Sequence, residues 1–436
     1  MVLKANGFMR KLKARLQEAQ VVYLLIAAVV FLVTVRGFID NFLGCGTVLV
    51  DACFIAVVLW CIFALCTGKV SRSRHRAVLS CYLFWTFLCV VVGGLQLLYG
   101  KTTISSAVMG LRNNNAYALL FLIVALHANE RGIKELYRLF VNCGVVICAF
   151  AIFQFALRNV LPESLLVLNG EDVFRLYGTD FIRVTGLMGN TVIFGGYAVI
   201  LFALVWAQLL SVDFRSASLW GKLGVIALAN LLTFSRASIA GMGLIACVQF
   251  VLYGCTHHRA LEYLIIAVVG VGSLVGIILV FFKDSTIVQR LLNLNTDWTE
   301  GSDEGHVKMI RDAIRAIRNN SGFGALMGSS NSVITDGAIF AYLLEWGVPV
   351  FCVFVVLFLW ICAIALRNCS SSNAMTGSLC NGFVGMSLYM ACFSFVNSAY
   401  CARSVLVFFW MVAGMVLVMS DQRGISARGL LRVPNA

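Results

Sequence analysis

Apolar stretches of about twenty residues recur along the whole sequence, and they constrain the fold more than any other feature. A stretch of that length crosses the ~30 Å hydrocarbon core of a bilayer as an α-helix. The twelve stretches that we identify cover 21–38, 46–66, 77–99, 114–128, 138–158, 190–211, 223–235, 237–254, 262–282, 338–365, 378–397 and 403–420. Strands are excluded for these segments because lipid offers no partner to an open strand edge. The sequence therefore predicts an all-α polytopic membrane protein with about twelve transmembrane helices.

The composition leads to the same fold class. Hydrophobic residues make up 61% of the chain and charged residues 12%, whereas a soluble domain is about half apolar and a quarter charged. Soluble enzymes and nucleic-acid-binding proteins are therefore excluded. No repeat, linker or low-complexity tract divides the chain, so we expect residues 1–436 to form a single integral membrane domain. The 16 cysteines form no C-x-x-C pair and the five histidines are scattered, so we expect no metal site or cofactor.

Positive charges in the short loops predict the orientation in the membrane, because Lys and Arg are retained on the cytoplasmic side. Five such residues lie within 4–15, four within 67–76 and three beyond residue 420. With twelve spans these segments share one side, so both termini are expected in the cytoplasm. The first span follows basic residues, and no cleavage site comes after it. We interpret it as a retained signal-anchor.

Two external segments are long enough to build a site, at about 158–190 and 283–337. With this topology the external side carries 14 basic residues, of which only Lys101, Lys283 and Lys308 are lysines. Long loops escape the orientation rule, so the excess is compatible with no ligand at all. Arginine, however, binds phosphate oxygens with two parallel hydrogen bonds, which lysine cannot do. An external arginine excess next to a membrane therefore indicates a lipid-linked phosphate as a candidate ligand.

The second external segment contains an amphipathic helix at about 306–317. Its apolar residues recur at helical spacing, and a basic face accompanies them. That face consists of Lys308, Arg311, Arg315 and Arg318. Such a helix can simply lie against lipid headgroups. Alternatively, it lies across a cavity mouth with its apolar face on the membrane domain and its arginines facing inward.

Two further arginines lie close to membrane spans. Arg183 begins the segment RVTGLMGN, which ends at Asn190 and leads into a span. Arg236 follows Ser235 between two apolar runs that are too closely spaced for a long loop. A charge at that depth is costly unless it faces protein or a wet cavity. It therefore marks either a structural ion pair or a ligand site.

These pieces occur in an order that resembles the O-antigen polymerase and ligase superfamily. The resemblance rests on R-x-x-G-x-x-x-N at 183–190, Ser-Arg at 235–236, and an arginine-bearing external helix that ends in a glycine turn at 311–324. It covers about 183–365. It implies a metal-independent glycosyltransferase in the bacterial inner membrane, with its active site on the periplasmic side. The implied substrates are glycans on undecaprenyl pyrophosphate, and the implied partners are membrane lipids, a flippase and a chain-length regulator.

The resemblance also implies roles for individual residues. Arg183, Arg236 and Arg311 match the motif positions and would bind the pyrophosphate, and Arg315 and Arg318 share the helix of Arg311. Ligases of this superfamily carry a His followed by Asn, Ser or Gln, with a Gly eleven residues after the His. Here Asp336 occupies the place of the His, with Gly347 eleven residues later. This departure favours a polymerase over a ligase, and leaves Asp336 as a candidate group for deprotonating the acceptor hydroxyl. The alternative interpretation of Asp336 is a helix N-cap.

A transporter is the alternative from a different class, because lipid-linked oligosaccharide flippases also commonly have twelve spans. Such a protein needs charges and helix breaks deep in the bundle, whereas the charges here are concentrated toward one side and the chain has three prolines. We therefore expect polymerisation of lipid-linked repeat units rather than their transport. The identity of the sugars and their linkage are encoded by no motif.

Overall fold

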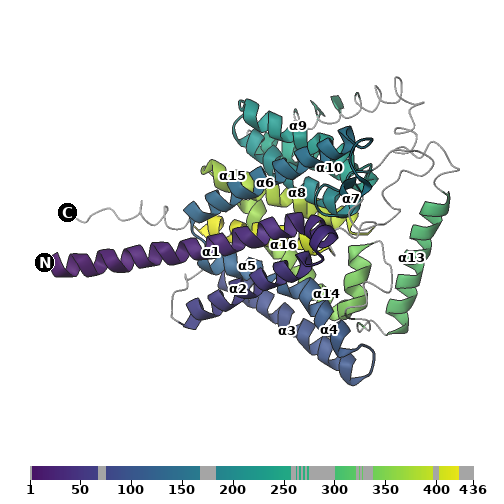
Figure 1. Cartoon of the computed structure of the whole chain (residues 1–436), viewed down its shortest axis with the longest axis horizontal. Helices are drawn as coiled ribbons and strands as arrows, with labels where there is room; N and C mark the ends of the chain where they lie inside the picture. The colour runs from purple at the N-terminus through teal and green to yellow at the C-terminus, as the bar shows by residue number, and fades with distance from the viewer. Residues whose placement is uncertain are drawn as a thin grey trace.

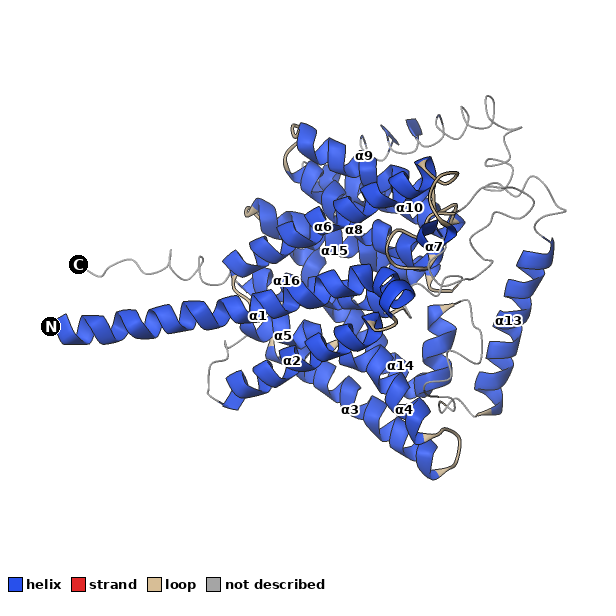
Figure 2. Cartoon of the chain, in the orientation of Figure 1, coloured by secondary structure: helices blue, strands red, loops and turns tan. Residues whose placement is uncertain are grey.

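The computed structural model of this chain is a bundle of helices (Figures 1 and 2). The structure describes residues 2–66, 75–166, 183–256, 262, 265–266, 269–270, 273, 300–320, 324, 327, 337–395 and 402–421. Within these residues the regular structure is helical throughout, with no strand. The predicted all-α fold class is therefore confirmed for the described part of the chain.

The structure describes the following helices, in chain order. They are α1 (Val2–Leu43), α2 (Gly46–Cys66), α3 (Arg76–Leu98), α4 (Ile104–Leu111), the π-helix η1 (Arg112–Ala116), α5 (Leu119–His127), α6 (Glu130–Ala156), α7 (Glu163–Leu166), α8 (Thr191–Ser211), α9 (Ala217–Leu231), α10 (Arg236–Thr256), α13 (Glu300–Asn319), α14 (Ala338–Asn368), α15 (Ala374–Phe393) and α16 (Arg403–Asp421). The first half of α1 extends beyond the bundle, and α13 runs crosswise over the opposite end (Figure 1).

Among the described residues, seven helices are long and apolar enough to cross a membrane. They are Val21–Leu43, Gly46–Ala64, Arg76–Leu98, Glu130–Ala156, Thr191–Ser211, Arg236–Cys255 and Ala338–Asn368. Two shorter apolar helices cover Ala217–Leu231 and Ser404–Ser420. The described part of the chain is thus all-α, and its long apolar helices indicate a membrane-embedded protein. Twelve spans remain a prediction, since most of the span expected at 262–282 lies outside the described residues.

The centre of the bundle is α8. In its most apolar stretch of 18 residues, 78% is buried. It packs against α15, α9 and α10. Close approach is possible because Gly382 of α15 faces Leu204 of α8, where a Cβ would lie only 2.8 Å from a leucine methyl carbon. Peripheral helices such as α2 and α3 instead expose apolar side chains on one face. This division between a packed centre and an apolar exterior is the one that lipid imposes.

The fourth expected span is divided into three helices. The sequence predicts a helix over 114–128, or one that starts earlier, near Thr103, with Arg112 and the asparagines 113–115 conspicuous inside it. The structure has α4, η1 and α5, starting at Ile104. Thr103 caps α4 by accepting a hydrogen bond from the Ser106 N–H at 3.2 Å. The π-helix comprises RNNNA, residues 112–116. Its polar residues are buried or half-buried, and they meet partners on α2 and α14.

A break in the N-terminal third of α14 shapes the same region. Gly347 has φ 75°, a left-handed conformation that favours glycine, and Pro349 follows it. Proline has no N–H, so the carbonyl of Glu345 loses its helical partner four residues later. Gln96 of α3 replaces that partner, donating from Nε2 to the Glu345 carbonyl at 2.9 Å. The break therefore depends on a side chain from another helix.

Candidate functional site

Arg183 belongs to a segment that leads back into the bundle before α8. Its Nε donates to the carbonyl of Thr233 at 2.8 Å, and the Val184 N–H donates to the carbonyl of Leu232 at 3.2 Å. The segment is buried beyond this point: Val184 and Thr185 are 2% and 0% exposed. It ends at Asn190, whose Oδ1 accepts the N–H groups of Val192 and Ile193 and so caps α8. Residues 183–190 are thus fixed against the bundle.

Two glycines make this path possible. Gly186 and Gly189 have φ of 56° and 75°, which a residue with a Cβ adopts only with strain. Beside them, Leu187 accepts a hydrogen bond from the Phe38 N–H of α1 at 3.1 Å. The R-x-x-G-x-x-x-N pattern therefore has a local structural role as well, because its Gly and Asn form the turn and the helix cap.

Arg236 follows the turn to which Arg183 is hydrogen-bonded. A turn of four residues, 232–235, joins α9 to α10, and Arg236 is the first residue of α10. The Thr233 hydroxyl donates to the Asn230 carbonyl at 2.7 Å and accepts the Ser235 N–H at 3.2 Å. This turn is the one that receives Arg183. The structure therefore brings Arg183 and Arg236 to one turn, which we call the arginine junction, and both side chains are half-buried there.

Buried polar groups below the junction were missed at the sequence level. Asn230 is fully buried and neither atom of its amide has a hydrogen-bond partner, and the same holds for the Thr191 hydroxyl. Gly195 of α8 approaches Ser238 of α10 so closely that a Cβ would lie 2.8 Å from the Ser238 Oγ. No sequence signal distinguishes these residues from ordinary polar residues in spans.

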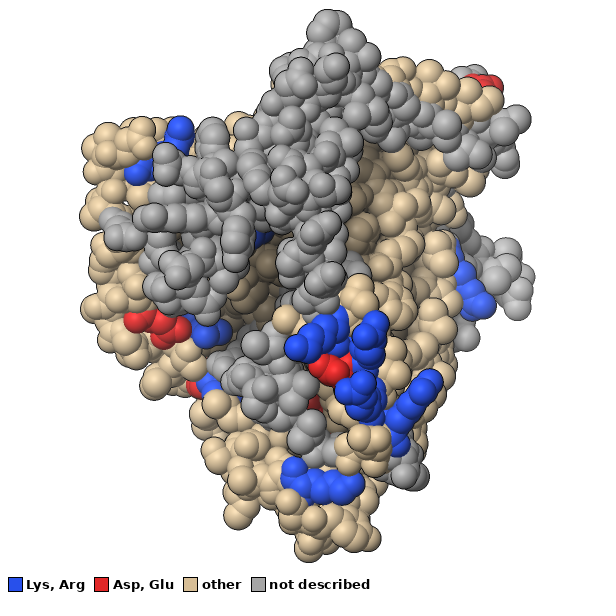
Figure 3. Space-filling view, turned by 90° about the vertical axis from the view of Figure 1, so that its right-hand side faces the viewer, with Lys and Arg blue, Asp and Glu red and all other residues tan. Residues whose placement is uncertain are grey.

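The remaining three arginines lie on α13. The helix forms as predicted, and Ala313 is fully buried where α13 packs against α14. Arg311, Arg315 and Arg318, however, are exposed. Figure 3 shows the Lys and Arg side chains of this helix gathered on its outer surface.

The expectation that these arginines face inward is therefore wrong. At 3.6 residues per turn, Arg311 and Arg315 project from the side of the helix opposite Ala313, so the apolar and basic faces cannot both contact the bundle. Arg315 also pairs with the exposed Asp312 at 3.4 Å. The alternative interpretation, a helix that lies against lipid headgroups, is compatible with exposed arginines.

Asp336, the candidate base, lies outside the described residues. Its neighbour Gly337 is the N-cap residue of α14. The two interpretations of Asp336, as a base and as a helix cap, both stay predictions.

A second polar constellation surrounds the π-helix. The Arg112 guanidinium makes a two-pronged ion pair with Asp51 of α2, with Nε to Oδ1 at 3.1 Å. The Tyr117 hydroxyl donates to the same carboxylate at 2.6 Å. On the other side, the Asn114 amide donates to the carboxylate of Glu345, which is 2% exposed. Arg112 and the three asparagines were conspicuous inside a span, but their partners were not predictable.

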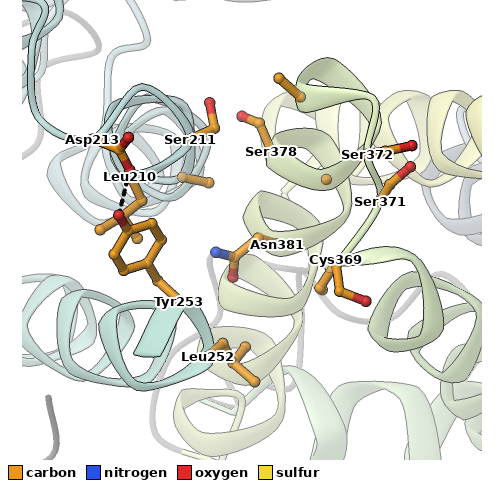
Figure 4. Close-up of a pocket in the computed structure, with 14 residues that line it drawn as sticks. Leu210, Ser211, Asp213, Leu252, Tyr253, Cys369, Ser371, Ser372, Ser378 and Asn381 are labelled. Atoms are coloured by element: carbon orange, nitrogen blue, oxygen red, sulfur yellow. Dashed lines mark hydrogen bonds between the residues drawn. The ribbon is translucent and has the colours of Figure 1, made fainter. Parts of the chain in front are cut away.

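A cavity of about 370 Å³ lies at the opposite ends of α8 and α10 (Figure 4). Its polar lining includes five serines, Asn381 and Asp213, whose carboxylate accepts a hydrogen bond from Tyr253. None of the described residues that line it is a lysine or an arginine. Across the described ranges, no group of three His, Cys, Asp or Glu residues is arranged to hold a metal ion.

The sequence matches no protein-family model, and no curated protein matches it either.

Proposed function

We propose that this protein is a membrane-embedded glycosyltransferase that polymerises lipid-linked oligosaccharide repeat units at the periplasmic face of the bacterial inner membrane. The observation that supports this most is the arginine junction. Arg183 bonds to Thr233, fifty residues later in the chain, and Arg236 begins the next helix. Two half-buried guanidinium groups at one helix start are chemically suited to an anion with several oxygens.

The proposed reaction transfers the growing glycan from undecaprenyl pyrophosphate to the next lipid-linked unit. The acceptor hydroxyl oxygen forms a bond to the anomeric carbon, and the bond from that carbon to the pyrophosphate oxygen breaks. The hydroxyl proton passes to a base, for which Asp336 is our candidate. Negative charge develops on the departing pyrophosphate, and Arg183 and Arg236 stabilise it.

The three arginines of α13 take a lesser part in this proposal. Their exposure means that they meet a lipid-linked pyrophosphate only after α13 changes its orientation. We therefore expect Arg311→Ala, Arg315→Ala and Arg318→Ala to reduce transfer less than changes at the arginine junction.

The decisive test is turnover of purified protein on lipid-linked repeat units. Losing one charged contact costs about 1.5–3 kcal/mol, so Arg183→Ala and Arg236→Ala should each slow transfer by roughly 10- to 150-fold. Lysine at either position should restore part of the rate. Arg131→Ala is the matched control, because its side chain is 89% exposed and pairs with Glu135 one turn away. Normal rates in both junction variants would contradict the assignment.

A deletion strain separates the proposal from its alternatives. Loss of a polymerase leaves single repeat units on the surface lipid. Loss of a ligase leaves lipid A-core without polymer, because the polymer stays on undecaprenyl pyrophosphate. Loss of a flippase leaves the lipid-linked units on the cytoplasmic side.

A further inference from the structure

The cavity of Figure 4 lies where three helices end and a fourth begins. The last turns of α8 and α10 line it together with the residues that follow α14, and α15 forms its far wall. Its volume of about 370 Å³ falls within the range of small-molecule sites in proteins. Both α8 and α10 have 21 residues, so about 30 Å of helix separates the cavity from the arginine junction. The cavity is therefore suited to a second, separate ligand.

Buried polar side chains without hydrogen-bond partners lie in the wall of this cavity. Asn381 of α15 is 8% exposed, and its Oδ1 accepts no hydrogen bond. The Ser378 hydroxyl, 4% exposed, lacks a partner too, apart from the neighbouring Tyr137 hydroxyl. Figure 4 shows the Asn381 side chain pointing from α15 toward Tyr253, and rotation about its soft terminal torsion can turn either amide atom to the cavity. Buried polar atoms are nearly always paired, so the unbonded oxygen indicates a ligand.

The charges around the cavity favour a cation. Among the described residues that line it, Asp213 alone carries a charged side chain, and Arg215 and Arg367 are not part of the lining. The C-terminal ends of α8, α10 and α14 add partial negative charge. Only α15 begins here, and its first N–H groups are already bonded to the Asn373 side chain. An anion would therefore be repelled.

The turn after α8 holds Asp213 at the cavity. Asp213 and Phe214 have φ of 49° and 62°, which is uncommon for residues other than glycine. The Phe214 ring stacks on Trp220 with centroids 6.1 Å apart and lies 6.2 Å from the Tyr253 ring. The Tyr253 hydroxyl donates to the Asp213 carboxylate. These contacts keep the turn in its strained conformation, so the carboxylate is fixed in place although it is exposed.

The hydrogen-bonding groups narrow the kind of cation. A primary ammonium group has three N–H donors and no acceptor, and the Asp213 carboxylate, the Asn381 oxygen and the serine hydroxyls can accept them. A quaternary ammonium group would leave the Asn381 oxygen unbonded because it has no N–H. A bare metal ion needs several oxygens converging at about 2.0–2.6 Å, and the cavity is much larger than that. Leu210 and Leu252 offer apolar contact to the carbon atoms of an organic ligand.

We propose that this cavity binds a small organic molecule through its primary ammonium group, with Asp213 and Asn381 as the acceptors. The proposal is independent of the proposed function, because the cavity and the arginine junction share no residue. Two sources offer the same chemistry. One is a free amine in the cytoplasm, which this end of the bundle faces in the predicted orientation. The other is the ethanolamine headgroup of a phospholipid, since headgroups lie at the ends of membrane-spanning helices.

The first test uses ethanolamine as the free amine, with purified protein in a neutral detergent. Binding is measured by saturation-transfer NMR. Ethylene glycol has a similar size but no charge, and choline has the charge but no N–H. Ethanolamine should bind at least about tenfold more tightly than either compound, because hydrogen bonds to a charged group are the strong ones. Equal binding of ethanolamine and ethylene glycol would overturn the proposal.

Two variants connect binding to the cavity. Asp213→Asn removes the charge but keeps the turn, since asparagine adopts the left-handed conformation and still accepts from Tyr253. Asn381→Leu removes the unbonded oxygen with little change of volume. Each should weaken ethanolamine binding by about tenfold. Glu135→Gln is the matched control, because its carboxylate on α6 is 60% exposed and distant in sequence from the cavity. Unchanged binding in Asp213→Asn would exclude the site, and the protein's thermal unfolding shows that this variant is folded.

The last test distinguishes the two sources. The protein is placed in phosphatidylcholine nanodiscs that contain phosphatidylethanolamine or phosphatidylglycerol, and the lipid that stays bound after transfer to detergent is counted by native mass spectrometry. Retention of phosphatidylethanolamine by the wild type but not by Asp213→Asn identifies a lipid headgroup as the occupant. Ethanolamine binding without such retention identifies a free amine. Binding of neither ethanolamine nor phosphatidylethanolamine would mean that water alone fills the cavity, and the proposal would be wrong.

Discussion

Replacing Gln96 by methionine tests the break in α14 most directly. Methionine has a similar shape but no hydrogen-bonding groups, so the change removes two buried hydrogen bonds and creates little empty space. It removes the hydrogen bond that Gln96 donates to the Glu345 carbonyl, which Pro349 cannot replace because it has no N–H, and it removes the acceptor of the Met327 N–H. Each buried group left unsatisfied costs about 1–3 kcal/mol. The predicted loss of stability is therefore about 2–6 kcal/mol.

Unfolding of the purified protein in mixed micelles measures this loss. Gln154→Met is the matched control: Gln154 is equally buried, but only its Nε2 is bonded, to the Leu165 carbonyl at 2.8 Å. The control should lose at most half as much. If Gln96→Met unfolded like the wild type, or no more easily than Gln154→Met, the account of the α14 break would be refuted.

Three further changes address other parts of the molecule. Asp51→Asn leaves the Arg112 guanidinium without its carboxylate and should reduce stability by up to about 3 kcal/mol, less than for a fully buried pair because both side chains are about a quarter exposed. In a double-mutant cycle, adding Arg112→Gln should cost less than it does in the wild type, and full additivity of the two losses would argue against coupling. Asn190→Ala should cost about 1 kcal/mol in thermal unfolding by removing the cap of α8, whereas Asn190→Asp should keep it; equal losses would exclude capping. Asp336→Asn should abolish transfer while the protein stays folded, and full turnover would remove Asp336 from the mechanism.

Local patterns in the sequence predicted local structure well. The spacing of Met309, Ala313 and Ile317 predicted a helix, and α13 covers that segment with Ala313 buried. The same helical spacing also determines the direction in which the basic residues project. We expected Arg311 and Arg315 to face a ligand because arginine binds phosphate oxygens, whereas the helix geometry places them opposite Ala313, where both are exposed.

Contacts between distant residues could not be predicted. Arg112 was conspicuous within a span, but its partner Asp51 is 61 residues away, and Asn114 meets Glu345 across 231 residues. These pairs depend on how α2, η1 and α14 pack together, which hydrophobic spacing does not encode. The contact of Arg183 with the turn before Arg236 stands between these two cases. The resemblance grouped the two motifs, and the hydrogen bond to Thr233 specifies how they meet.

The tryptophans around the α14 break give this protein a built-in optical probe. Trp85 lies 5.3 Å from Trp346 and 5.7 Å from Trp410 between ring centroids. Indoles this close couple their excited states, so the three should contribute a strong near-ultraviolet circular dichroism signal and exchange excitation energy. Trp346 precedes Gly347, so any straightening of α14 would change its spacing from Trp85. The region between α3 and α14 can therefore be followed in real time by light, in unlabelled protein.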